Sequence, residues 1–160
     1  MSPANSRLLP ILRLAVLCED VEEDGSGRPY RLVVPVHTVR FPPDRPQRYR
    51  PPTLKLYLQL QGGVGTFYIW VSLREEGEVV EVYRSRAPFE SSFDDDSYRI
   101  VPLELALELS GLAFPRPGVY EILVHANYVN LHDPNARVPL SYPPIRVTAL
   151  SGNGAEQGAL

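Results

Sequence analysis

Two segments in the middle of the chain alternate strictly between apolar and polar residues. Leucine occupies every even position over residues 54–60, and Phe, Ile, Val and Leu occupy the odd positions over residues 67–73. A period of two places alternate side chains on opposite faces of a β-strand, and no helix keeps it. The glycine-rich run 62–65 between them supplies the positive-φ freedom of a tight turn. The pattern predicts a β-hairpin with one apolar face to bury.

The other face of this predicted hairpin carries aromatic residues. With the turn centred on residues 63–64, Tyr57 lies opposite Trp70 and Gln59 lies opposite Tyr68. Aromatic rings beside hydrogen-bonding groups are typical of surfaces that bind proteins or sugars. The structural alternative is that cross-strand aromatic pairs only stabilise the hairpin. These four residues are the candidate binding site.

Shorter alternating segments precede and follow the predicted hairpin. Residues 101–109 consist of good helix formers, but their leucines occupy odd positions, and pattern outranks propensity. Pro35 places its strand at a sheet edge or a bulge, because proline cannot donate to a ladder. About eight short strands and no amphipathic helix predict an all-β, two-sheet antiparallel β-sandwich. The further segments expected to be strands are 12–18, 30–36, 80–82, 101–109, 120–126 and 145–149.

The chain has the length of one domain. Its 160 residues are enough to bury a hydrophobic core without disulfides. We expect a flexible N-terminus over residues 1–10, the β-sandwich over 11–150 and a disordered tail over 151–160.

Charge and cysteine content exclude several classes of function. A net charge of −3 makes nucleic-acid binding unlikely. The single cysteine, Cys18, cannot form an internal disulfide and favours a reducing compartment, so we expect a cytoplasmic protein. Arg13 interrupts the apolar run that begins at Leu8, which argues against a secretory leader, and no run is long enough for a membrane-spanning helix.

Residues 14–21 (LAVLCEDV) and 112–122 (LAFPRPGVYEI) resemble a widespread bacterial family of unknown function. Its members open with a Cys-acidic-Asp-Val box and close with a Pro-Gly-x-Tyr strand. The resemblance implies an immunoglobulin-like β-sandwich with no assigned reaction, so it carries over no functional residues. Such proteins tend to have a glycine in the middle of the strand at 31–41, where this chain has Val33, Val34, Pro35 and Val36.

Catalytic and metal-binding patterns are sparse in the sequence. No Gly-x-Ser-x-Gly elbow occurs, and Cys18 alternates with apolar residues, which indicates a core position. His37, His125 and His132 are scattered, so zinc has no local ligand framework. Asp94, Asp95 and Asp96, with a second acidic run at 19–24, are weak candidates for calcium. We therefore expect no enzyme and no cofactor.

Two functional hypotheses remain open. The first is a non-catalytic interaction module that binds a protein partner, or its own copy, through the aromatic face or a sheet edge. The second is a ligand-binding sandwich that takes calcium at its acidic loops or a carbohydrate at the aromatic face.

Overall fold

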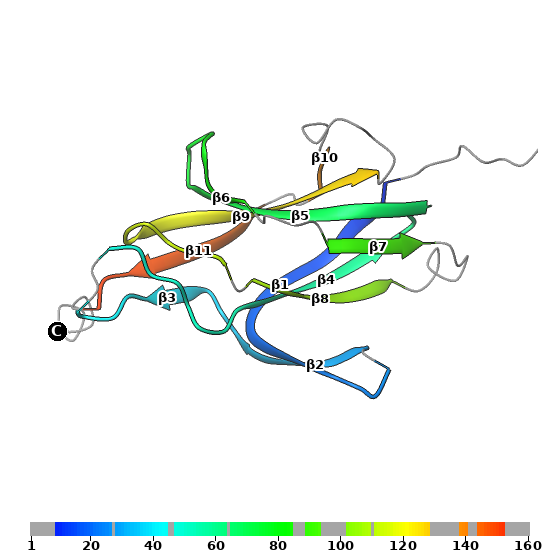
Figure 1. Cartoon of the computed structure of the whole chain (residues 1–160), viewed down its shortest axis with the longest axis horizontal. Helices are drawn as coiled ribbons and strands as arrows, with labels where there is room; N and C mark the ends of the chain where they lie inside the picture. Colours follow the sequence, from blue (N-terminus) through cyan, green and yellow to red (C-terminus); the bar gives the residue numbers. More distant parts are fainter. Residues whose placement is uncertain are drawn as a thin grey trace, which may run out of the picture.

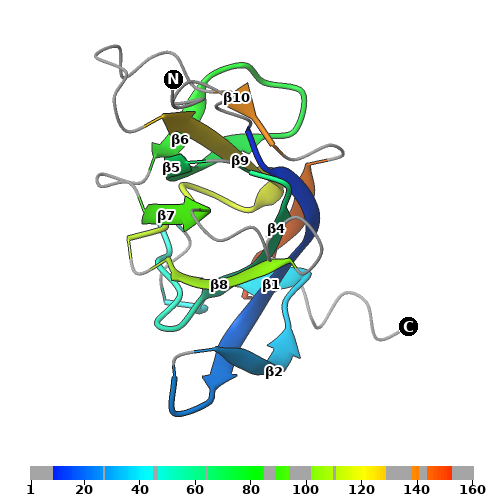
Figure 2. The same cartoon turned by 90° about the vertical axis from the view of Figure 1, so that its right-hand side faces the viewer.

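The computed structural model describes residues 9–26, 28–44, 47–63, 65–84, 89–93, 102–109, 111–128, 138–140 and 144–152. Its two β-sheets pack face to face, and the described residues contain no helix (Figures 1 and 2). None of the described residues therefore forms a helix that could cross a membrane. The strands are β1 (Ile11–Glu23), β2 (Pro29–Pro35), β3 (Thr38–Arg40), β4 (Lys55–Gln61), β5 (Gly65–Glu75), β6 (Glu81–Arg84), β7 (Phe89–Phe93), β8 (Leu103–Glu108), β9 (Gly118–Tyr128), β10 (Val138–Pro139) and β11 (Ile145–Leu150).

The four-stranded sheet has the order β2-β1-β4-β8. The larger sheet has the order β3-β11-β9-β5-β6, with β10 paired to β9 and β7 paired to β5. β3 and β11 are parallel, and the other pairs are antiparallel. The predicted all-β, two-sheet architecture is confirmed, including the strand at β8. Pro35 ends β2, which is an edge strand as its proline predicted.

The predicted β4–β5 hairpin is wrong. β4 pairs with β1 and β8, whereas β5 pairs with β9, β6 and β7, so the two strands belong to different sheets. The chain crosses between the sheets around Gly62, whose φ is 78°. Each strand has a full apolar face, and packing these faces against each other buries both of them. A flat hairpin would place both faces on the same side and leave them to be covered by something else.

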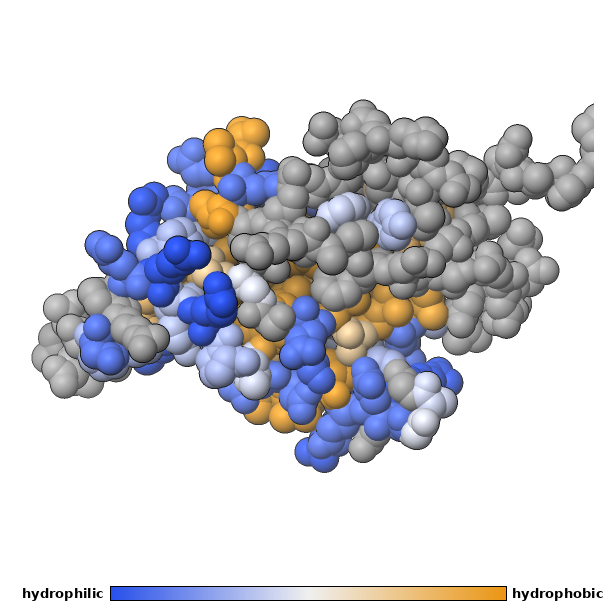
Figure 3. All heavy atoms as spheres, viewed as in Figure 1, coloured by the Kyte–Doolittle hydropathy of each residue, from blue (hydrophilic) through white to orange (hydrophobic). Residues whose placement is uncertain are grey.

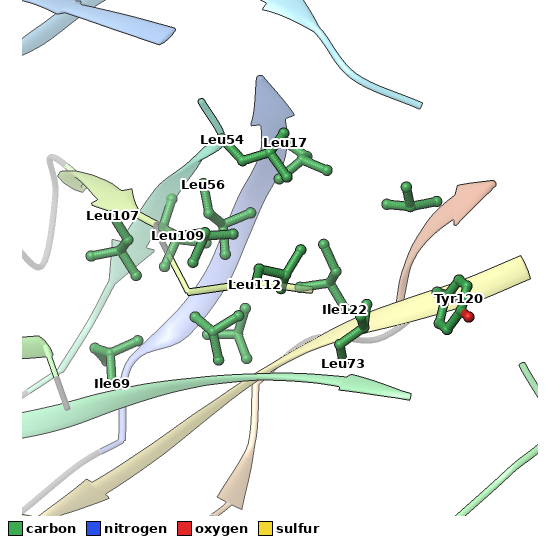
Figure 4. Close-up of a cluster of buried hydrophobic side chains, with 14 of the residues drawn as sticks. Leu17, Leu54, Leu56, Ile69, Leu73, Leu107, Leu109, Leu112, Tyr120 and Ile122 are labelled. Carbon is green, nitrogen blue, oxygen red and sulfur yellow. The ribbon is translucent and has the colours of Figure 1, made fainter. Parts of the chain in front are cut away.

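The core lies between the sheets. Figure 4 shows leucines of β1, β4 and β8 meeting Ile69 and Leu73 of β5 and Ile122 of β9. Leu56, Leu58 and Leu60 are fully buried, as are the facing side chains of β5. Complete burial of a side chain of this size stabilises the fold by about 1.5–3 kcal/mol. The fully buried apolar side chains of β5 are Phe67, Ile69, Val71 and Leu73.

Tyr120 fastens the start of β9 to the loop before it. Its ring is fully buried, packs edge-on against Phe114 with centroids 5.2 Å apart, and its hydroxyl donates a 2.5 Å hydrogen bond to the carbonyl oxygen of Arg116. Tyr49, which pairs with Phe114 through a β-bridge, holds the proline-rich loop against the same cluster by packing on Phe41.

β1 serves two partners along its length. Residues 11–18 pair with β4, and residues 18–23 pair with β2. A register shift between Leu12 and Leu14 divides the apolar face predicted for 12–18, because Leu12 packs on the main core whereas Val16 and Cys18 belong to a second cluster. The predicted flexible N-terminus and tail lie almost entirely outside the described residues.

Val34 has a backbone conformation that suits glycine. Its φ is 49°, and its side chain is exposed. This conformation costs an L-residue about 1–2 kcal/mol, and glycine removes that strain. Glycine also has more conformational freedom in the unfolded state, which lowers the gain by about 0.5–1 kcal/mol. We therefore expect Val34→Gly to raise the free energy of unfolding in urea by about 0.5–1 kcal/mol. The neighbouring Val33→Gly is the control and should lower it; equal destabilisation by both would contradict the strain at Val34.

Loss of the Tyr120 hydroxyl should lower the free energy of unfolding more than loss of the Tyr49 hydroxyl. Tyr120→Phe keeps the ring but leaves the Arg116 carbonyl without its donor, at an expected cost of about 1–2 kcal/mol in the free energy of unfolding. Tyr49→Phe keeps the Phe41 contact and should change stability by less than about 0.5 kcal/mol. Thermal and urea unfolding of the two variants check this, and equal effects would remove the special role of Tyr120.

Candidate functional site

The four residues predicted to form one aromatic patch lie on opposite sides of the molecule. Tyr57 and Gln59 face outward from β4, in register with Val16 and Leu14 of β1. Tyr68 and Trp70 face outward from β5 in the other sheet, with ring centroids 6.5 Å apart and nearly perpendicular planes. The patch is divided because the apolar faces of β4 and β5 point toward each other, so their polar faces point apart.

Tyr57 and Gln59 lie beneath a hairpin that we call the arm, residues 19–35. The arm consists of the distal part of β1 and all of β2, and it continues past the part of β1 that pairs with β4 (Figures 1 and 2). Two ion pairs join the arm to β4 and β8: Asp20 with Lys55 at 2.9 Å and Arg28 with Glu104 at 3.0 Å. The second apolar cluster joins residues of the arm to these two strands; its members are Cys18, Val21 and Tyr57, with Val16, Leu32 and Ala106 packed against it.

A chain of hydrogen bonds orders the polar groups under the arm. The Tyr57 hydroxyl donates to Glu104 Oε1 at 2.5 Å and accepts from Gln59 Nε2 at 2.7 Å. Arg28 Nε donates to Glu104 Oε2 at 3.0 Å. The hydrogen bond from Tyr57, opposed by burial and assisted by Arg28, lowers the pKa of Glu104, whereas burial and the bond to Glu104 raise the pKa of Tyr57. At neutral pH the carboxylate therefore accepts and the phenol donates.

These groups line a hollow between the arm and the sheet, which we call the arm cleft. Its volume is about 270 Å³, and its walls come from all four strands of the smaller sheet. Arg28 and Arg31 are on the arm at the cleft, and their side chains are 65% and 69% exposed. The residues lining the cleft are Leu14, Pro29, Arg31, Leu32, Tyr57, Gln59 and Glu104.

The size and chemistry of the arm cleft favour one or two side chains of a partner. Pockets for whole small ligands hold about 300–1,000 Å³, and this cleft lies below that range. Both Glu104 oxygens already accept hydrogen bonds. The two exposed guanidiniums each lie beside a carboxylate of the same chain, Arg28 with Glu104 at 3.0 Å and Arg31 with Glu22 at 3.8 Å. An apolar wall with balanced charge beside it suits an aliphatic side chain.

No metal site occurs in the part of the chain that the structure describes, since no three His, Cys, Asp or Glu residues gather there. In the acidic run 19–24, Asp20 pairs with Lys55, and Asp24 Oδ1 accepts hydrogen bonds from the backbone of Ser26 and Arg28. The calcium candidates Asp94, Asp95 and Asp96, and His132, lie outside the described residues. His37 is exposed on the segment between β2 and β3, and His125 lies opposite Trp70 on β9.

Cys18 lies on β1 directly before the arm, between Pro35 of β2 and Lys55 of β4, and is fully buried. Its Sγ atom is 3.5 Å from the carbonyl oxygen of Lys55. Burial raises the pKa of the thiol, with a smaller contribution from Asp20, so little of the reactive thiolate forms at neutral pH. The side chain therefore packs in the apolar cluster. A thiol reagent can reach it only when the arm opens, so its reaction rate reports on arm opening.

Sequence reasoning missed Arg28 and Glu104. Glu104 lies directly opposite Gln59 across β4 and β8, and Arg28 is 76 residues before it in the chain. The alternation over 101–109 placed Glu104 on the polar face, which is the only local signal for it.

Glu104→Gln should lower stability in a pH-dependent way. Because the pKa of Glu104 is lowered in the folded state, its ionised form stabilises the fold above the unfolded value of about 4.3, and this contribution is lost as the pH falls through the folded value. We expect a cost of about 1–2 kcal/mol in urea unfolding at pH 7 that shrinks toward zero below about pH 4. Exposed Glu108→Gln is the control; a cost independent of pH would contradict the assignment.

Opening of the arm should be visible at Cys18. Removing the ion pair with Glu104 by Arg28→Ala loosens the arm, so we expect native-state alkylation of Cys18 to accelerate several-fold. Arg31→Ala removes a similarly exposed guanidinium whose ion pair is with Glu22, within the arm itself, and it should leave the rate unchanged. Alkylation kinetics followed by mass spectrometry measure both; identical rates in the two variants would mean that Arg28 does not hold the arm.

Comparison with protein-family models, with curated proteins and with solved structures returned no match. The family resemblance at residues 14–21 and 112–122 therefore stays a prediction.

Proposed function

We propose that the chain is a non-catalytic interaction module of the cytoplasm that binds a protein segment in the arm cleft. The observation that carries this proposal is the cleft itself: apolar side chains form its wall on the outer face of a sheet, and the exposed guanidiniums of Arg28 and Arg31 border it, each beside a carboxylate of the same chain. The Tyr57, Gln59 and Glu104 side chains form hydrogen bonds with one another. They therefore shape the surface of the cleft, and none of the three is an activated nucleophile or base. This role replaces the single aromatic patch expected from the sequence.

The fold that we propose for this module is immunoglobulin-like. In such sandwiches strands A, B and E are neighbours in one sheet, and strands G, F and C are neighbours in the other. The orders β1-β4-β8 and β11-β9-β5 support this arrangement. The hydrogen bond of Tyr120 to Arg116 supports it as well, because a tyrosine near the start of strand F makes such a bond in that fold.

The alternative function, a sandwich that binds calcium or carbohydrate, has less support. A sugar site needs an open ring face, and Tyr57 is only 5% exposed. Tyr68 and Trp70 are half-buried, and their edge-to-face contact uses part of their ring surface.

Site-specific photo-cross-linking tests the proposal. A photoreactive residue replaces Arg31 in one variant and Arg146 in another; Arg146 is a similarly exposed arginine on β11 of the other sheet. Irradiation in the source cells should give a discrete protein adduct from position 31 only. An excess of unlabelled wild-type chain should compete it away, and an excess of Leu32→Asp chain should not.

Adducts of equal yield from both positions, or competition by Leu32→Asp as strong as by the wild type, would contradict binding at the arm cleft. Circular dichroism and urea unfolding of Leu32→Asp establish beforehand that this competitor is folded.

A further inference from the structure

The end of β3 and the proline-rich segment after it present arginines that have no carboxylate partner. We call residues 40–50 the basic loop. Arg40, Arg48 and Arg50 are exposed, and among the described residues no ion pair involves them. Over residues 40–50 the sequence has four arginines and one carboxylate, that of Asp44. On a chain whose net charge is −3, the basic loop is therefore a local positive surface.

Hydrogen bonds and packing hold the basic loop around Tyr49. Tyr49 and Phe114 exchange two backbone hydrogen bonds of 2.8 Å, and Arg48 N donates to the carbonyl oxygen of Pro115 at 2.9 Å. The Tyr49 ring packs on the buried ring of Phe41, with centroids 5.6 Å apart. The arginines on either side of Tyr49 therefore project from a fixed backbone, so a partner does not have to order that backbone when it binds.

The backbone of Arg48 is strained. Its φ is 50°, in the left-handed region that residues other than glycine seldom adopt. Such strain persists only where the surrounding contacts enforce it, and strained residues gather at binding sites. Glycine would relieve the strain, yet the chain carries an exposed arginine at this position. Its guanidinium is available to a partner outside the chain.

Carboxylates at the neighbouring end of β5 do not neutralise the basic loop. Arg116, beside the loop, pairs with Glu75 at 2.8 Å, and Glu76 pairs with Arg146 at 2.9 Å. Glu78 lies on the turn between β5 and β6, which projects toward the top of Figure 1, whereas β3 lies below it. Figure 3, in the same view, shows hydrophilic residues covering most of the described surface at this end of the molecule.

The chemistry of the basic loop fits carboxylates on an extended protein segment. Guanidiniums bind carboxylates and phosphates through charge-assisted hydrogen bonds. Proteins that bind single-stranded nucleic acid add open aromatic rings on which bases stack, but the two aromatic rings of the basic loop, Phe41 and Tyr49, pack on each other. The net charge of −3 also repels a strand with a phosphate at every nucleotide. A short acidic segment of a protein is the better fit.

We propose that the basic loop binds an acidic segment of a protein partner, whose carboxylates pair with Arg40, Arg48 and Arg50. The basic loop shares no residue with the arm cleft. The inference therefore goes beyond the proposed function of the cleft, and neither depends on the other.

Fluorescence anisotropy of a labelled oligo-glutamate peptide tests the proposal. The full chain is titrated into the peptide at an ionic strength of about 0.05 M, where exposed charges are weakly screened. We expect a dissociation constant of roughly 10 µM to 1 mM, and loss of binding in about 1 M salt. Arg50→Glu should weaken binding about tenfold. Arg48→Gly should weaken it about threefold without lowering stability in urea, because glycine removes the backbone strain.

Two variants elsewhere on the chain match these changes. Arg13→Glu reverses the charge of another exposed arginine, and Val34→Gly replaces another exposed residue with a positive φ. Both should bind the peptide like the wild type.

A wild type that does not bind the peptide would overturn the proposal. Equal weakening by Arg13→Glu and Arg50→Glu would also overturn it, because the effect would then come from net charge alone. An oligothymidine strand of the same length that binds the wild type more tightly than the peptide would overturn it in favour of a nucleic-acid surface. None of these outcomes changes the cross-linking expected at position 31, which tests the arm cleft separately.

Discussion

The structure depends on the burial of β4 against β5. These consecutive strands each carry an unbroken apolar face, and the protein buries both faces by placing the strands in separate sheets. β4 is then flanked by β1 and β8, and β5 by β9 with β6 and β7, so each strand is interior to its own sheet. Complete burial of Leu56, Leu58, Ile69 and Leu73 shows how tightly the two layers close. The outward sides of the two strands consequently face opposite directions.

That arrangement leaves the outer face of the four-stranded sheet to be covered by the arm. The Asp20 to Lys55 and Arg28 to Glu104 pairs each have one partly buried member and add a modest contribution to holding the arm in place. The apolar cluster around Cys18 and Val21 supplies the burial. Glu104 then has a second task, because its half-buried carboxylate orders the Tyr57 hydroxyl and, through it, the amide of Gln59.

The arm cleft leaves apolar surface open next to balanced charge. Its apolar wall comes from Leu14, Pro29 and Leu32. The exposed guanidiniums of Arg28 and Arg31 border this wall, and each lies beside a carboxylate of the same chain, Glu104 for Arg28 and Glu22 for Arg31. The proposed contact at the cleft therefore depends on its apolar wall more than on charge.

Local pattern in the sequence determined the longer strands, the edge position of Pro35 and the outward direction of Tyr57, Gln59, Tyr68 and Trp70, because each follows from a period of two or from a missing amide hydrogen. It did not predict β3, β7 or β10. The tertiary structure decided which strands pair. Alternation is the same whether a strand joins its neighbour in a hairpin or crosses to another sheet, so the division of the four aromatic-patch residues left no trace in the sequence. Arg28 and Glu104 are 76 residues apart in the sequence and meet only in the folded chain. Their contact depends on how the whole core packs, which no local pattern describes.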